Sequence, residues 1–171
     1  MPGKVFQPGA VSCSAAISCP EKGAHWEAAL GLLQEMPRRL LQPDLVSCDS
    51  AVSACEKGLH WETALGLLRE MPRTVLLPGV ISYDATVSAC EKAVQWETSL
   101  GLLVEMHTGA LQPDVISCSA AISCSEKGVH WQAAFGLLQE MPRRSLQPDL
   151  VSCDSGVSSC QKGVHLSLIH I

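Results

Sequence analysis

Residues 45–79 read LVSCDSAVSACEKGLHWETALGLLREMPRTVLLPG and contain two apolar patterns with helical spacing. In the first, Val46, Asp49, Val52 and Cys55 follow one another every three residues, which predicts a helix of about 10–12 residues. The second is one continuous apolar stripe made of Trp61, Ala64, Leu65, Leu68 and Met71. The segment therefore predicts a helical hairpin.

Residues that favour helix ends lie where these two patterns begin and stop. We expect Gly58 to end the first helix in the left-handed conformation that glycine tolerates best. Pro72 disfavours helical geometry at Met71, so we expect the second helix to end there. Aspartates that can cap free backbone N–H groups precede three of the expected first helices: Asp44, Asp114 and Asp149.

The hairpin pattern recurs every 35 residues without an insertion. The four tryptophans of the chain follow this step, at Trp26, Trp61, Trp96 and Trp131. We divide the chain into a partial preceding repeat (1–9), repeat 1 (10–44), repeat 2 (45–79), repeat 3 (80–114), repeat 4 (115–149), a truncated repeat 5 (150–165) and a tail (166–171). Because a lone hairpin cannot bury both of its apolar faces, the repeats predict an all-α solenoid of stacked hairpins.

We expect the tail at 166–171 to be non-native. After His165 the second-helix pattern is replaced by Leu-Ser-Leu-Ile-His-Ile. A common sequencing-library adapter, translated in frame, would encode this hexapeptide.

Composition excludes several classes of protein. The chain has 171 residues, of which 47% are hydrophobic, too many for a disordered protein. No apolar run is long enough to cross a bilayer. The formal net charge of −5 counts against nucleic-acid binding, because phosphate contacts usually need a basic excess.

The nine cysteines recur at fixed repeat positions and are expected to be small buried residues. No Cys-x-x-Cys spacing occurs, and Tyr83 replaces cysteine at one position, so we expect no metal or cofactor. The chain contains no Gly-rich phosphate loop and no His-Glu-x-x-His, so we expect no enzymatic activity. We also expect the tryptophans to pack between helices and the histidines beside them to have a polar surface role.

The repeat resembles the P-type pentatricopeptide repeat over residues 6–165. The resemblance is carried by the 35-residue step, the Trp-Glu-x-Ala-Leu block, the Glu-Met that follows it and the Pro-Asp link. Tetratricopeptide repeats are related but run at 34 residues. The resemblance implies that the solenoid is a right-handed superhelix.

The resemblance also implies single-stranded RNA as the partner, with one base bound per repeat. The base would be sandwiched by the aliphatic side chains of Val11, Val46, Ile81, Ile116 and Val151. Base edges would be read at the fifth position of each repeat by Ser14, Asp49, Asp84, Ser119 and Asp154. The second reader, at the last position of each repeat, would be Asp44, Gly79, Asp114 and Asp149.

The reader pairs differ between repeats. Repeats 1 and 4 pair a serine with an aspartate, which by the resemblance favours guanine. Repeats 2 and 3 depart from the family pattern, with aspartate at the first reader position. Gly79 brings no side chain to repeat 2, and Asp84 with Asp114 offers only acceptors to a base and repels phosphate.

Two functions follow as expectations. The resemblance implies sequence-specific RNA binding in organelle RNA processing, stability or editing, in a chloroplast or mitochondrion. The alternative is a protein-protein interaction scaffold without RNA binding, which the acidic balance favours. Neither a membrane nor DNA is expected as a partner, and without an organelle address the protein would be cytoplasmic.

Overall fold

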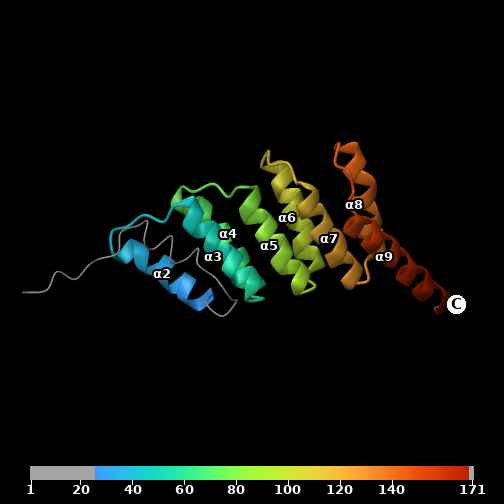
Figure 1. Ribbon diagram of the computed structural model, residues 1–171, viewed down its shortest axis with the longest axis horizontal. Helices are drawn as coiled ribbons and strands as arrows, with labels where there is room; N and C mark the ends of the chain where they lie inside the picture. The colour runs from blue at the N-terminus through green and yellow to red at the C-terminus, as the bar shows by residue number, and fades with distance from the viewer. Residues whose placement is uncertain (1–25, 170–171) are drawn as a thin grey trace, which may run out of the picture. The chain divides into compact units, whose positions relative to one another are not determined.

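The structure, a computed structural model, describes the backbone of residues 26–169 and the side chains of residues 26–163. Every regular element in this part of the chain is helical, which confirms the predicted all-α class (Figure 1). In chain order the elements are α2 (Trp26–Arg38), α3 (Leu45–Lys57), α4 (Trp61–Glu70), the 3-10 turn η1 (Met71–Thr74), α5 (Val80–Lys92), α6 (Trp96–Thr108), α7 (Val115–Lys127), α8 (Trp131–Arg143) and α9 (Leu150–Ile169). None of the described helices is both long and apolar enough to span a membrane.

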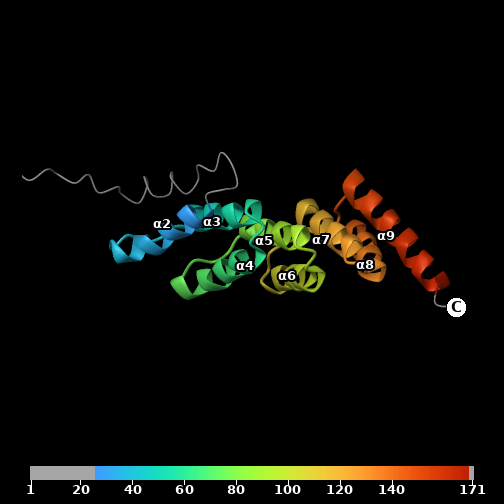
Figure 2. The ribbon, with the colours of Figure 1, turned by 90° about the horizontal axis from the view of Figure 1, so that it is seen from below.

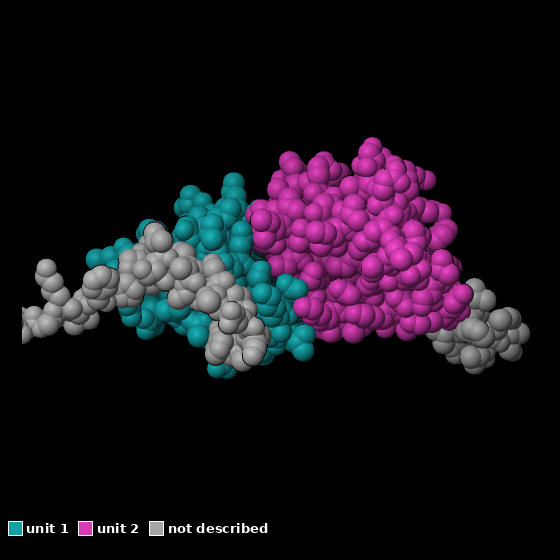
Figure 3. Space-filling view, in the orientation of Figure 1, with its two compact units in different colours: residues 1–78 teal, residues 79–171 magenta. Residues whose placement is uncertain are grey.

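The chain divides into two compact units, residues 1–78 and 79–171 (Figure 3). In the first unit, α3 packs against both α2 and α4. In the second, α7 packs against the helices before and after it, and α5, α7 and α9 lie side by side (Figure 2). Within each unit the described helices therefore pack on neighbouring helices of the same and the adjacent hairpin, as expected for stacked repeats.

Buried methionines anchor the core where each second helix ends. Met36, Met71, Met106 and Met141 occupy equivalent repeat positions and are almost completely buried. In the first unit, Met36 and Met71 belong to one cluster with small residues of α3. The core is thus built from methionine, leucine, alanine and cysteine, as a chain with so few aromatic residues requires.

The first helices do not end as predicted. Gly58 has a right-handed φ of −78°, and the next residue, Leu59, takes the left-handed conformation at φ 64°. The turn is closed by two backbone bonds, from Leu59 N to Glu56 O at 3.2 Å and from His60 N to Cys55 O at 2.9 Å. The prediction that glycine supplies the left-handed residue is therefore wrong.

Gly58 is instead required for space. A Cβ atom at this position would lie 2.8 Å from Cδ1 of Trp26, which belongs to the preceding repeat. The same relationship holds in the second unit, where a Cβ at Gly128 would lie 3.0 Å from Cδ1 of Trp96. Glycine at these two positions thus lets the indoles of Trp26 and Trp96 lie directly on the end of the next repeat's first helix.

Each of these indoles also lies against a histidine. The ring centroids of Trp26 and His60 are 3.8 Å apart, and those of Trp96 and His130 are 3.6 Å apart. The expected packing role of the tryptophans is confirmed at these two positions. The expectation of a polar surface role for the histidines missed a packing contact, because the rings of His60 and His130 pack against the tryptophan of the preceding repeat.

Prolines do not end the second helices at the same place. In α4 the helix ends at Glu70 and η1 follows, close to the prediction. In α2 and α8, however, Pro37 and Pro142 lie inside the helix. A proline in the last turn removes one backbone N–H donor. The turn after α8 is nevertheless closed by the hydrogen bond from Leu146 N to Met141 O at 2.9 Å.

The last helix is longer than the predicted 10–12 residues. α9 extends from Leu150 to Ile169, beyond Gly163, where the equivalent helices of the other repeats end. The backbone after Gly163 stays helical and does not enter the left-handed turn found after Gly58 and Gly128. The side chains of the tail predicted to be non-native lie outside the described residues.

Most of the described cysteines are buried and unpaired. Cys48, Cys55, Cys90, Cys118 and Cys124 are buried, which confirms the expectation for these five, whereas Cys153 is exposed and Cys160 half-buried. Burial raises the pKa of the Cys90 thiol to about 12 and that of Cys55 to about 11. The buried thiols are therefore protonated and poorly reactive at neutral pH. Cys13 and Cys19 lie outside the described residues.

Candidate nucleic-acid interface

The residues expected to sandwich a base lie in the first turns of the first helices and are exposed. Val46, Ile81, Ile116 and Val151 have exposed fractions between 57% and 65%. Val11 lies outside the described residues. Large aliphatic side chains at equivalent positions of α3, α5, α7 and α9 thus contact solvent rather than the core.

The second readers lie at the N-termini of the same helices. Asp44 and Asp114 are the N-caps of α3 and α7, and Asp149 precedes α9. In each case the carboxylate accepts a hydrogen bond from the backbone N–H three residues later, which confirms the predicted caps. Gly79 is the N-cap of α5 and has no side chain to offer.

The first readers lie one turn into the helices. Ser119 is buried, Asp49 and Asp84 are half-buried, and Asp154 is exposed. Ser14 lies outside the described residues. Because Ile116 and Ser119 are three residues apart on α7, the expected sandwiching residue and reader share one face of that helix.

The structure brings the two readers of repeat 4 together. Ser119 Oγ lies 3.1 Å from Asp149 Oδ1, within hydrogen-bond distance, although the two residues are 30 positions apart in the chain. Ser152, in the first turn of α9, joins them. Its Oγ lies 2.6 Å from Ser119 Oγ and also 2.6 Å from Asp149 Oδ1.

These contacts set the charge state of Asp149. Hydrogen bonds from the Ser152 side chain and backbone hold the pKa of the Asp149 carboxyl below its ordinary value. The pair therefore presents a hydroxyl beside an ionised carboxylate at neutral pH.

In repeat 3 the equivalent position holds two carboxylates. Ser117 Oγ donates to Asp84 Oδ1 and also lies 3.2 Å from Asp114 Oδ1. Burial raises the pKa of Asp84 to about 6, a rise that the Ser117 hydrogen bond opposes and the Asp114 charge reinforces. Repeat 3 therefore has the same arrangement as repeat 4 with a different protonation equilibrium.

No protein-family model matches the chain, and no curated protein matches it either. Solved structures do match. The crystal structure of the maize pentatricopeptide repeat protein PPR10 has a TM-score of 0.79 at 19% identity, over 90% of this chain and 22% of that one. The chain has the pentatricopeptide repeat fold.

Two further pentatricopeptide repeat structures were determined with RNA. PPR10 in complex with an 18-nucleotide psaJ RNA element has a TM-score of 0.74 at 18% identity, over 91% of this chain and 23% of that one. The pentatricopeptide repeat domain of Arabidopsis thaliana protein-only RNase P 1, in complex with tRNA, has a TM-score of 0.73 at 15% identity. That match covers 94% of this chain and 91% of the domain. The chain thus spans less than a quarter of PPR10.

Sequence reasoning on this pentatricopeptide repeat fold missed the serines at the third position of the repeats. Ser47, Ser82, Ser117 and Ser152 are completely buried. The signal in the sequence was that this serine is constant, whereas the next residue is cysteine in most repeats and Tyr83 in repeat 3. A buried hydroxyl that never varies needs a partner.

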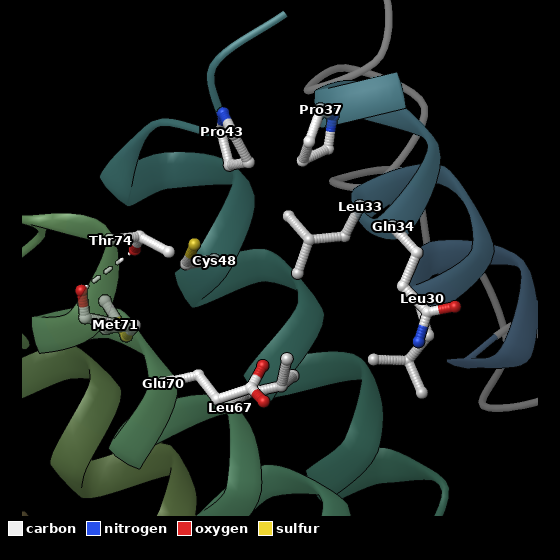
Figure 4. A pocket seen from close by; sticks show the side chains of 10 residues that line it. All are labelled: Leu30, Leu33, Gln34, Pro37, Pro43, Cys48, Leu67, Glu70, Met71 and Thr74. Atoms are coloured by element: carbon white, nitrogen blue, oxygen red, sulfur yellow. Dashed lines mark hydrogen bonds between the residues drawn. The ribbon is translucent and has the colours of Figure 1, made fainter. Parts of the chain in front are cut away.

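The second helices of the pentatricopeptide repeats border apolar grooves. One of about 240 Å³ in the first unit is lined by α2, α3, α4 and η1, with Leu33, Cys48 and Met71 among its walls (Figure 4). One of about 290 Å³ in the second unit is lined by the equivalent positions, including Leu103, Cys118 and Met141. Among the described residues no group of three His, Cys, Asp or Glu side chains could hold a metal ion.

Proposed function

We propose that this chain binds single-stranded RNA, one base per repeat, and acts in organelle RNA processing, stability or editing. The aliphatic side chains in the first turns of α3, α5, α7 and α9 would flank the bases, and the two reader positions would contact their edges. Two of the solved structures with this fold were determined in complex with RNA, which supports the class of partner. The organelle and the processing step rest on the family resemblance.

The observation that carries the proposal is the joined pair of Ser119 and Asp149. Their polar atoms lie 3.1 Å apart and are flanked by the exposed side chains of Ile116 and Val151. A base placed between these aliphatic groups would meet a hydroxyl and a carboxylate on one edge. A hydroxyl and a carboxylate together can accept hydrogen bonds from the N–H donors of a base. Their position beside two exposed aliphatic residues is the arrangement that base binding requires.

Charge predicts that the binding is weak. The chain has a net charge of −5. Two of its lysines are paired with glutamates, Lys127 Nζ with Glu91 Oε1 and Lys162 Nζ with Glu126 Oε1, each at 3.0 Å. The acidic excess opposes the approach of phosphate, so affinity should be measured at low salt, where counterion release favours binding most.

The test is selection from a random RNA pool with the full chain at low salt. We expect enrichment of two guanines separated by two weakly specified bases, since Ser14 with Asp44 and Ser119 with Asp149 are three repeats apart. Val151→Ser should weaken binding to the selected RNA. Val104→Ser is the matched control, because Val104 is as exposed as Val151 but lies on the second helix α6. Absence of any enriched RNA, or equal losses in both variants, would contradict the proposal.

A protein-binding scaffold is the second candidate, favoured by the acidic charge and by exposed apolar groups on the second helices such as Val104 and Phe135. In that case Val104→Ser would weaken a salt-tolerant protein complex and Val151→Ser would not. The same two variants therefore separate the two functions.

A further inference from the structure

Ser152 makes three contacts that link the two readers of repeat 4, although it belongs to the next repeat. Its backbone N–H donates to Asp149 Oδ1 at 2.8 Å, and its hydroxyl lies 2.6 Å from both Asp149 Oδ1 and Ser119 Oγ. The Ser152 side chain is completely buried. Solvent therefore does not compete for these contacts.

The positions of the two hydroxyl protons follow from these distances. An ionised carboxylate only accepts, so the Ser152 hydroxyl donates its single proton to Asp149 Oδ1. The short contact between the two hydroxyls then needs Ser119 as its donor, because Ser152 has no second proton to give. The result is a chain of donation from Ser119 to Ser152 to Asp149.

This chain determines what the readers offer to a base. The proton of Ser119 is directed toward Ser152, so the Ser119 oxygen presents lone pairs. Both Ser152 groups donate to Oδ1 of Asp149, and Ser119 Oγ lies 3.1 Å from the same oxygen, so Oδ2 is the carboxylate oxygen left for a ligand. Two acceptors side by side match guanine, the one RNA base with neighbouring N–H donors, at N1 and N2, on its Watson–Crick edge.

We propose that Ser152 is a positioning residue that makes the Ser119–Asp149 pair selective for guanine, although it contacts no base itself. This inference rests on the proposed RNA binding and names a third position, contributed by the following repeat, that determines specificity. Ser117 has the same position relative to Asp84 and Asp114 of repeat 3. The arrangement is thus seen in two copies, with different readers attached to the same buried hydroxyl.

The test compares Ser152→Ala with the unaltered chain in selection and in competition between guanine and adenine at the base of repeat 4. Removal of the hydroxyl frees the Ser119 proton to face the base, so we expect the preference for guanine over adenine to fall about tenfold at this base alone, as for the loss of one hydrogen bond to a charged group. Ser152→Thr retains the hydroxyl and should restore the preference. An unchanged preference in Ser152→Ala overturns the inference.

Ser125→Ala is the matched control for packing. Ser125 is also completely buried in a first helix, but its hydroxyl donates to Ala121 O within the same helix. Base preference should not change in this variant. An equal loss of preference in Ser125→Ala and Ser152→Ala assigns the effect to general destabilisation and overturns the inference.

A second test uses the unaltered chain, so its outcome does not depend on whether a variant folds. By carboxyl NMR titration, Asp149 should have a pKa below the ordinary aspartate value, because the Ser152 hydroxyl and backbone N–H donate to it. An ordinary pKa would mean that the chain of hydrogen bonds is absent in solution and overturns the inference. If the unaltered chain binds no RNA while Asp149 titrates low, the proposed function is wrong and the hydrogen-bonded arrangement is only structural.

Discussion

The indole of Trp96 lies on the imidazole of His130, with ring centroids 3.6 Å apart and the ring planes inclined by 29°. The two residues are the same distance apart in the chain as Trp26 and His60, whose rings make the same contact in the first unit. Consecutive repeats are therefore joined by one specific contact at the end of the first helix. Gly128, two residues before His130, provides the surface on which the indole rests.

Gly128→Ala should destabilise the protein. The added Cβ would lie 3.0 Å from Trp96 Cδ1 and 3.2 Å from His130 Cδ2, so a rigid ring must move. We expect a loss of about 1–3 kcal/mol in the free energy of unfolding, measured by chemical denaturation. Gly136→Ala, at an exposed site of α8 with nothing within 4 Å, should instead stabilise by up to about 1 kcal/mol through helix propensity. The same sign for both variants would disprove the close-packing role of Gly128.

Val129→Gly should stabilise the protein. Val129 has a φ of 62°, a left-handed conformation that costs a β-branched residue about 1–2 kcal/mol. We expect a gain of about 1 kcal/mol in a denaturant melt. Val157→Gly removes another exposed valine, from the regular helix α9, and should cost about 1 kcal/mol. A loss of stability in Val129→Gly would show that its side chain contributes more than its backbone costs.

Ser99→Ala should also stabilise. Ser99 is completely buried where the other repeats have alanine, and its hydroxyl has no nitrogen or oxygen partner. Removing a buried hydroxyl whose remaining contact is with a weakly accepting thiol should gain about 1 kcal/mol in thermal or chemical unfolding. The reverse substitution, Ala134→Ser, should cost about as much, because it places a hydroxyl at the equivalent position in α8. Lower stability of Ser99→Ala would contradict this assignment.

Asp84 should make stability depend on pH. Burial raises its pKa from 3.8 to about 6, so the folded chain holds a proton between about pH 4 and 6 that the unfolded chain has released. Stability therefore falls as pH rises through this window and stays lower above it. Asp84→Asn should raise the free energy of unfolding at pH 8 by about 1–2 kcal/mol and abolish this dependence of stability on pH. The expected gain is smaller than the full pKa shift would give, because the side chain is partly exposed to solvent. The exposed Asp154→Asn serves as control, and an unchanged slope in Asp84→Asn would refute the prediction.

The sequence sufficed for features determined within one repeat. The apolar spacing of residues 45–79 predicts both helices of the hairpin, and the aspartates before the first helices predict their caps. These features depend on contacts between residues a few positions apart, for which local spacing is informative.

Contacts between repeats were less accessible. The role of Ser152 depends on Ser119, which lies 33 positions earlier, and the role of Gly58 depends on the indole of Trp26. The spacing of apolar residues within one repeat does not indicate a contact with a residue of another repeat. Glycine at a helix end is also compatible with two explanations, a left-handed backbone and a close approach, and only the positive φ of Leu59 distinguishes them.

The seating of Trp96 on Gly128 also bears on how such an array can grow. One repeat contributes the indole, and the next contributes the glycine that it packs on, 32 positions later. A duplication of a whole multiple of 35 residues therefore keeps this spacing between the indole and the glycine at the new boundary. An insertion or deletion of another length would place some other residue beneath the indole. The constant 35-residue step therefore keeps indole and glycine in register at the boundaries that have both, although repeat 3 has Ala93 at the glycine position.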